Sequence, residues 1–135
     1  MTVIFPAAIL HASAVSGTIG RNPGSELAMT SQEYLLVLCT CSSVQEAEAV
    51  TTALLEERLA ACVNRLAGIK SSYRWEGRVR HDDEILLLIK TTRDSYERLE
   101  AMIKNIHSFE IPEIIAVSIE TGSTDYLEWI GASTA

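Results

Sequence analysis

Two stretches of the chain are apolar almost without interruption, and they constrain the fold more than any other feature. Residues 34–41 read Tyr-Leu-Leu-Val-Leu-Cys-Thr-Cys, and residues 85–89 read Ile-Leu-Leu-Leu-Ile. A strand with one face in water alternates apolar and polar residues, whereas a strand covered on both faces is apolar throughout. We therefore predict two central strands that are covered on both faces.

A helical pattern follows each of these predicted strands. Ser43 and Glu46 have the spacing of a capping box, and Asp94 and Glu97 repeat it. Apolar residues then recur at the spacing of a buried helix face. They are Ala47, Val50, Leu54, Leu55 and Leu59 in the first segment and Tyr96, Leu99, Ile103 and Ile106 in the second.

The remaining segments predict a hairpin, a last strand and a short helix. The first helix runs with almost no linker, across residues 56–64, into a strand at 62–73 that is bent near Gly68. Residues 75–78 have turn composition, and the polar residues 79–83 are predicted to project beyond the core. A β-branched strand is expected at 113–120, and a short helix begins at Ser123 or Thr124.

This order of elements predicts an α+β fold of the ferredoxin-like type, βαββαβ plus a short C-terminal helix. In such a fold an antiparallel sheet carries both helices on one face. The helices alone do not explain strands that are apolar on both sides. We therefore expect further copies of the chain to cover the open face, and we predict a homo-oligomer.

The length of 135 residues suits a single compact domain, which we place at residues 32–135. Residues 1–31 are predicted to be an N-terminal extension, because 16–31 have the composition of a linker. The mostly apolar residues 1–14 weakly resemble an export signal, but they contain no Lys or Arg. We expect a cytoplasmic protein, with export as the alternative if residues 1–14 act as a signal.

Charge and cysteine content restrict the partners. Eighteen acidic residues against 11 Lys and Arg give a net charge of −7, which disfavours nucleic acid. No apolar run reaches the roughly 18 residues that cross a bilayer, so we expect no membrane partner. Three cysteines are an odd and small number, which is typical of reduced thiols rather than a disulfide framework.

Cys39, Cys62 and His107 are the natural candidates for metal ligands. Thiolate and imidazole suit copper or zinc. Cys39 and Cys41, two residues apart on a strand, are expected to point to the same face. The alternative is that the cysteines are small buried apolar residues, since no C-x-x-C or H-x-x-H spacing is present. A Cys62–His107 nucleophile pair has weaker support, and we predict no organic cofactor.

Six short pieces, in order over residues 34–131, resemble the CutA family of divalent-cation tolerance proteins. They are Leu38-Cys39-Thr40, Glu56-Glu57-Arg58-Leu59-Ala60-Ala61-Cys62-Val63-Asn64, Tyr73-Arg74-Trp75-Glu76-Gly77, Lys90-Thr91, Ile111-Pro112-Glu113-Ile114 and Tyr126-Leu127-Glu128-Trp129-Ile130. The resemblance implies a ferredoxin-like protomer in a compact homotrimer, similar to PII-type signalling proteins. It also implies a role in tolerance of copper and other divalent metal ions, without an established reaction, so we expect no enzyme.

The resemblance bears unequally on the candidate ligands. Cys39 and Cys62 stand at positions that match family cysteines, whereas Cys41 does not. His107 matches a histidine that precedes a Pro-Tyr pair in many members, but Ser108 and Phe109 follow it here.

A signalling trimer of the PII kind, which binds a small ligand or a protein without specific metal chemistry, is the alternative function. Clefts between protomers would then hold the ligand. The candidate lining residues are Tyr73, Arg74, Trp75, Lys90, Glu113 and Tyr126. Against this, we favour the interpretation that Trp75 and Trp129 are anchors of a core or an interface and that Glu113 is a salt-bridge partner.

Overall fold

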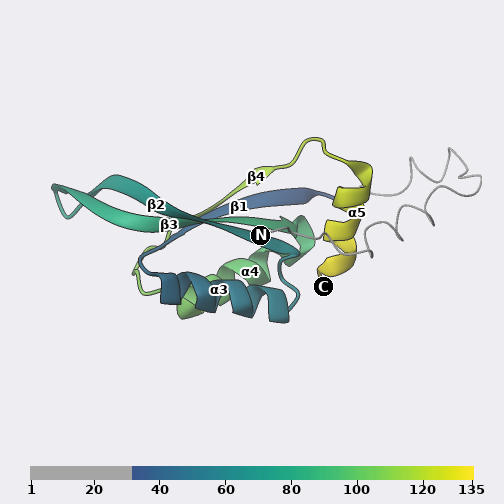
Figure 1. Cartoon of the computed structure of the whole chain (residues 1–135), viewed down its shortest axis with the longest axis horizontal. Coiled ribbons are helices and arrows are strands. Elements are labelled where there is room, and N and C mark those ends of the chain that lie inside the picture. Colours follow the sequence, from purple (N-terminus) through teal and green to yellow (C-terminus); the bar gives the residue numbers. More distant parts are fainter. Residues whose placement is uncertain (1–31) are drawn as a thin grey trace, which may run out of the picture.

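The computed structural model describes residues 32–135, and it confirms the α+β, ferredoxin-like architecture. Within these residues four antiparallel strands form one sheet in the order β2-β3-β1-β4. The elements are β1 (Tyr34–Cys41), α3 (Val44–Glu56), β2 (Cys62–Trp75), β3 (Arg78–Thr92), α4 (Arg93–Ile106), β4 (Ile114–Ser118) and α5 (Thr124–Ser133). Helices α3 and α4 lie on one face of the sheet, and α5 stands at one end (Figure 1). The N-terminal extension predicted at 1–31 lies outside the described residues.

The odd-numbered residues of β1 and β3 face the helices and form the core. Val37 pairs with Ile89 and Cys39 pairs with Leu87, so these side chains share one face. All four are fully buried, together with Val50, Leu54, Leu99 and Ile103 from the two helices. The two apolar runs therefore form adjacent central strands, as predicted.

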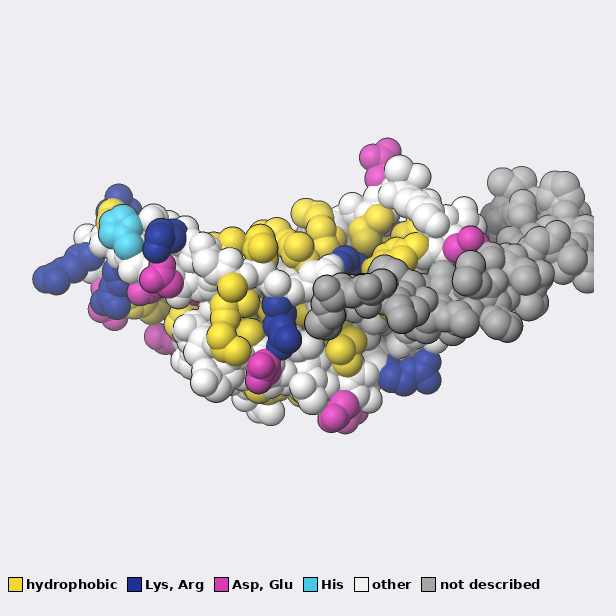
Figure 2. Space-filling model, in the orientation of Figure 1, with side chains coloured by type: hydrophobic (Ala, Val, Ile, Leu, Met, Phe, Trp, Pro, Cys, Tyr) yellow, Lys and Arg dark blue, Asp and Glu magenta, His cyan; other side chains and the backbone are white. Residues whose placement is uncertain are grey.

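The even-numbered residues of β1 and β3 point to the opposite face, which we call the open face. On it Leu66, Ile115 and Val117 are 52%, 52% and 49% exposed. Figure 2 shows hydrophobic side chains along this side of the sheet, away from the helices. Within one chain, the strands are thus covered by helices on one side only.

Strands β2 and β3 form a long hairpin that extends past the helices (Figure 1). Glu76 and Gly77 make its turn with φ values of 49° and 75°, the backbone twist that tight hairpins favour. The predicted bend is a register shift between Leu66 and Ile69, where Gly68 has a φ of 79°. Charged side chains gather at the hairpin end (Figure 2).

Helix α3 ends in a Schellman motif with arginine in the position that usually holds glycine. Arg58 has a φ of 56°. The Leu59 amide donates to the Leu54 carbonyl at 2.8 Å, and the Arg58 amide donates to the Leu55 carbonyl at 3.1 Å. This turn ends the helix and directs the chain into β2.

The turn is also fixed from outside the helix. The Arg58 guanidinium donates to the carbonyl of Ala132 at 2.9 Å, and the Thr91 hydroxyl donates to the carbonyl of Leu59 at 2.6 Å. The predicted helix-to-strand joint is therefore held by both α5 and β3.

One predicted helix start is confirmed and one is wrong. The Ser43 hydroxyl accepts the Glu46 amide at 3.1 Å and caps α3. Helix α4 begins at Arg93 with Thr92 as its N-cap, not at Asp94. Thr92 pairs with Tyr34 at the end of β3, so the strand turns directly into the helix. The last strand is also shorter than predicted, at Ile114–Ser118.

Candidate functional site

Two thiols and an imidazole meet beneath the sheet, and we call Cys39, Cys41 and His107 the thiol–imidazole cluster. One ligand atom from each lies within 4.8 Å of the others, and all three residues are buried. The cysteines come from the helix-facing side of β1, and His107 is the residue after α4. The fold thus joins the end of the first strand to the end of the second helix.

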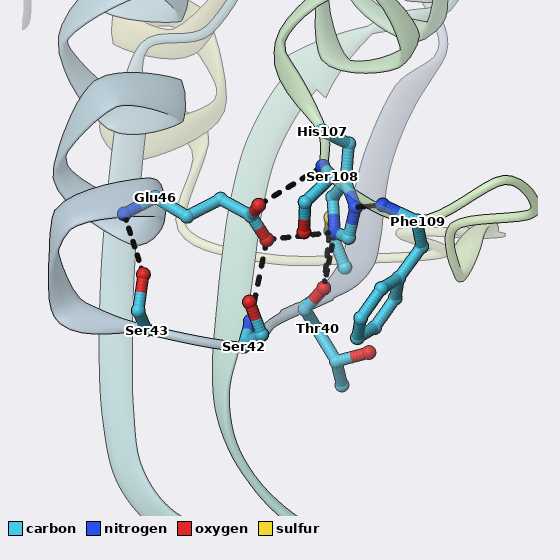
Figure 3. Close-up of polar contacts among 8 residues, drawn as sticks. Thr40, Ser42, Ser43, Glu46, His107, Ser108 and Phe109 are labelled. Carbon is cyan, nitrogen blue, oxygen red and sulfur yellow. Dashed lines mark hydrogen bonds and ion pairs between the residues drawn. The ribbon is translucent and has the colours of Figure 1, made fainter.

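Both ring nitrogens of His107 form hydrogen bonds in this state. The Phe109 amide donates to Nδ1 at 3.1 Å, and Nε2 lies 2.7 Å from the carbonyl oxygen of Thr40 (Figure 3). A nitrogen that accepts an N–H bond carries no proton, so the proton is on Nε2, which donates to Thr40. Hydrogen bonds at both ring nitrogens therefore hold His107 in a fixed orientation.

Glu46 supports the cluster from the first turn of α3. Its Oε1 accepts the Ser42 amide at 3.2 Å, and its Oε2 accepts the Ser108 amide at 3.0 Å (Figure 3). Burial by itself would raise the pKa of Glu46, but hydrogen bonds from Ser108 and Ser42, with the nearby His107, lower it overall. Glu46 is therefore a carboxylate at neutral pH, and its Oε1 lies 3.4 Å from Nε2 of His107.

The surroundings of Cys39 keep its thiol protonated. The pKa of Cys39 is raised by its hydrogen bond with Cys41, then by burial, and then by the negative charges of Glu113 and Glu46. A metal ion would have to displace this proton, because thiolate is the form that binds metals.

The donor set of the cluster fits copper better than zinc. Two cysteine thiolates are soft ligands of the kind that Cu(I) selects, and imidazole also suits copper. Structural zinc sites are almost always closed by four protein ligands, and the cluster offers three. To bind a metal ion, His107 would have to give up one of its two hydrogen bonds. One of them is donated by the Phe109 amide, in the loop after α4.

Cys62 lies on the other face of the sheet, which corrects its predicted grouping with Cys39 and His107. It pairs with Lys90 of β3, whereas Cys39 pairs with Leu87. Residues 87 and 90 of one strand point to opposite faces because side chains alternate. The same geometry separates Cys62 from His107, so the structure does not form the predicted nucleophile pair.

Cys62 belongs instead to a group at the helix-to-strand joint. The Lys90 ammonium lies 3.9 Å from its sulfur and donates to the side-chain oxygen of Asn64. The pKa of Tyr126 is raised to about 12, first by burial and then by its contact with Cys62. Lys90 and Tyr126, both predicted to line a cleft, therefore lie together here.

The other predicted cleft residues divide between a cavity and the surface. A cavity of about 630 Å³ lies between the hairpin and residues 108–113, and it is lined by Tyr73, Trp75 and Glu113. Arg74, between Tyr73 and Trp75 on the strand, points to the opposite face and does not line it. The predicted cleft is thus two separate places. Lys90 and Arg80, the strand partner of Tyr73, are ten residues and therefore about 33 Å apart along β3, at roughly 3.3 Å per residue.

Sequence reasoning missed three residues of these sites. Cys41 was placed on the same face as Cys39 by the period of a strand, but its approach to His107 depends on the tertiary fold. Glu46 was predicted only as a helix cap, and its bond to Ser108 joins segments 62 residues apart. Glu84 lines the cavity and is buried, although a charged residue before an apolar run resembles a strand boundary.

The structure so far defines a ferredoxin-like α+β domain with a buried set of potential metal ligands and a separate cavity. The model of the CutA1 divalent ion tolerance protein family matches residues 35–133. The chain therefore belongs to the CutA1 divalent ion tolerance protein family, as its motifs had indicated.

Individual relatives agree with this assignment. The divalent-cation tolerance protein CutA of Thermus thermophilus is 44% identical over 99 residues, which cover 73% of this chain and 96% of the relative. Protein CutA of Mus musculus is 31% identical over 128 residues, which cover 95% of this chain and 72% of the relative.

Solved structures give the same result. The Thermus thermophilus Cut A1 structure superposes with a TM-score of 0.74 at 43% identity, covering 76% of this chain and 99% of that chain. The CutA1 structure from Oryza sativa gives a TM-score of 0.76 at 37% identity, covering 79% and 98%.

Names among the relatives place CutA proteins in several compartments. They include a chloroplastic protein from Arabidopsis thaliana and a periplasmic protein from Archaeoglobus fulgidus. Between residues 32 and 135, no helix of this chain is long and apolar enough to cross a membrane.

Proposed function

We propose that this protein acts in tolerance of divalent metal ions by binding copper at the thiol–imidazole cluster. The observation that carries the proposal is the convergence of Cys39, Cys41 and His107 within 4.8 Å. When bound, copper would supply the charge that stabilises the two thiolates. His107, fixed by Thr40, would complete the ligand set, and Glu46 would hold the loop that covers it.

We propose that the protein binds metal ions and does not catalyse a reaction. The family description names tolerance of ions and no reaction. Support also comes from the separation of Cys62 and His107 on opposite faces of the sheet, which removes the candidate nucleophile and base from each other.

The proposed assembly is a homotrimer. The open face supports association, because Leu66, Ile115 and Val117 are about half exposed on a single chain. The number three comes from the family resemblance. The three free thiols support a reducing, cytoplasmic location, and the excess of acidic residues argues against a nucleic-acid partner.

Anaerobic titration with Cu(I) against a competing chelator tests the copper proposal. Wild type should bind one copper ion per protomer, and Cys39→Ser and Cys41→Ser should each lose most of the affinity. Cys62→Ser is the matched control, since it removes a thiol on the other face. Loss of binding in Cys62→Ser, with retention in the other two variants, would contradict the proposed site.

Binding of a small ligand, in the manner of a signalling trimer, is the second candidate function. The cavity beside Tyr73, Trp75 and Glu113 favours it, because about 630 Å³ is within the usual size of small-molecule sites. A thermal-shift screen separates the candidates. Stabilisation by copper alone supports metal handling, and stabilisation by an organic compound supports ligand binding.

A further inference from the structure

Glu84 is a buried acid whose partner is missing from the described part of the chain. Only 7% of the residue is exposed. Among the buried side-chain nitrogen and oxygen atoms of residues 32–135, its Oε2 is the one without a hydrogen-bond partner. Proteins rarely bury a polar group without a partner, because the group loses its water and gains nothing in return. The position therefore implies a partner that the folded chain itself does not supply.

Glu84 lies at the wall of the cavity. It pairs with Ile69 of β2 just beyond the bulge and, like Thr40, which also lines the cavity, is an even-numbered residue on the open face. In the proposed assembly the cavity would therefore lie in a cleft between copies of the chain. The terminal torsion of a glutamate has a broad, two-fold profile. A rotation about it exchanges the two carboxylate oxygens, so either one can be turned towards a molecule in the cavity.

The other walls suit a cation that carries an apolar body. Tyr73, Trp75 and Phe109 contribute three aromatic rings, whose faces attract positive charge. Glu113 adds a second carboxylate. The cationic Arg80 also lines the cavity, but it lies four residues along β3 from Glu84, roughly 13 Å for an extended strand.

A bare metal ion is a poor occupant of this cavity. Divalent cations need several ligand atoms that converge on one point. Within residues 32–135, the thiol–imidazole cluster is the one group of three or more His, Cys, Asp or Glu residues that meets this condition. Glu84 and Glu113 are not part of it. An organic cation, in contrast, can bind the carboxylate of Glu84 through its charge and contact the aromatic rings through its carbon atoms.

We propose that the cavity binds a small organic ammonium ion, with the charged nitrogen on Glu84 and the apolar body against Trp75 and Phe109. The proposal deepens the second candidate function, because it names the class of ligand and the anchoring residue. It does not depend on copper binding at the thiol–imidazole cluster.

Calorimetric titration of the full-length protein with benzylammonium, and with benzyl alcohol as its neutral counterpart, tests the proposal. Wild type should bind benzylammonium at least about tenfold more tightly than benzyl alcohol, since hydrogen bonds to charged groups are the stronger ones. Glu84→Gln should remove this difference. Glu97→Gln, an exposed acid on α4, is the matched control and should retain it.

The possible failures are distinguishable. Equal binding of both compounds by wild type would overturn the role of Glu84 while leaving a small-ligand site, and absence of binding by either would overturn both. If Glu84→Gln kept its preference for benzylammonium but changed the mass of the assembly in sedimentation, the carboxylate would pair with a neighbouring copy, and the proposal would be wrong. Unchanged Cu(I) stoichiometry in a folded Glu84→Gln that loses benzylammonium would support two separate sites.

Discussion

The carboxylate of Glu46 accepts a hydrogen bond from the backbone amide of Ser108 at 3.0 Å. Glu46 is in the first turn of α3, and Ser108 is in the loop that follows α4. This bond joins the first turn of α3 to the loop that begins at His107, in addition to the packing of α3 against α4. Conditions or substitutions that remove it should therefore act on stability and on the thiol–imidazole cluster at the same time.

We expect Glu46→Gln to destabilise the protein by about 1–3 kcal/mol at neutral pH, because a charge-assisted hydrogen bond is lost in a nearly buried position. The folded-state pKa of Glu46 is lowered. Its stabilisation is therefore complete above the unfolded value of about 4.3 and disappears as the pH falls through the lower folded value.

Denaturant unfolding of both proteins over a range of pH measures this effect. The difference between wild type and Glu46→Gln should be constant around neutrality and shrink below about pH 4. Glu48→Gln, an exposed acid on the same helix, serves as the control. A difference that grows in acid would show that the carboxylate is not stabilising in its charged form.

Copper binding should strengthen as the pH rises. Each thiol that becomes a ligand releases one proton, so two thiols give up to about a hundredfold increase in affinity per pH unit. Because the pKa of Cys39 is raised, the increase should continue beyond about pH 8.5, the ordinary pKa of cysteine. Competition with a chelator at several pH values measures the slope, and a flat profile would argue against thiolate ligands.

A charge on the open face should dissociate the assembly. We expect Ile115→Asp and Val117→Asp to give the mass of a single chain in sedimentation, because an association surface loses affinity when a buried position becomes ionised. Val44→Asp is the matched control, as Val44 is 56% exposed at the start of α3 on the other side. An unchanged mass in both open-face variants would remove this surface from the interface.

Arg58 gives a prediction about the backbone alone. The left-handed backbone region destabilises a residue other than glycine by roughly 1–2 kcal/mol. Arg58 lies in this region, with a φ of 56°. Arg58→Gly and Arg58→Ala lose the same hydrogen bond to Ala132. We therefore expect the glycine variant to be more stable than the alanine variant by about 1 kcal/mol in urea unfolding. Equal stabilities would mean that the turn relaxes in the alanine variant.

The fold was largely predictable because its signals are local. The apolar runs, the cap at Ser43 and the turn at Glu76–Gly77 each depend on residues that are close in sequence. The start of α4 was missed because pairing between Thr92 and Tyr34 decides where β3 ends, and that pairing joins distant segments.

The sites were less predictable for the same reason. The motifs placed Cys39 and Cys62 in one candidate group, but whether two strands present their side chains to the same face depends on register. Leu87 opposite Cys39 and Lys90 opposite Cys62 settle this question. Glu84 could not have been found from sequence, because its burial at the cavity wall depends on the tertiary fold rather than on its neighbours in sequence.

The division of the three cysteines between two faces gives the molecule its own chemical reporters. Cys39 and Cys41 are fully buried, whereas Cys62 is partly accessible. A thiol-reactive reagent should therefore modify Cys62 at a rate set by coverage of the open face. It should reach the other pair only when the core opens, so that slow modification measures the free energy of that opening. Two kinetic phases from one reagent would thus follow assembly and unfolding in the same sample.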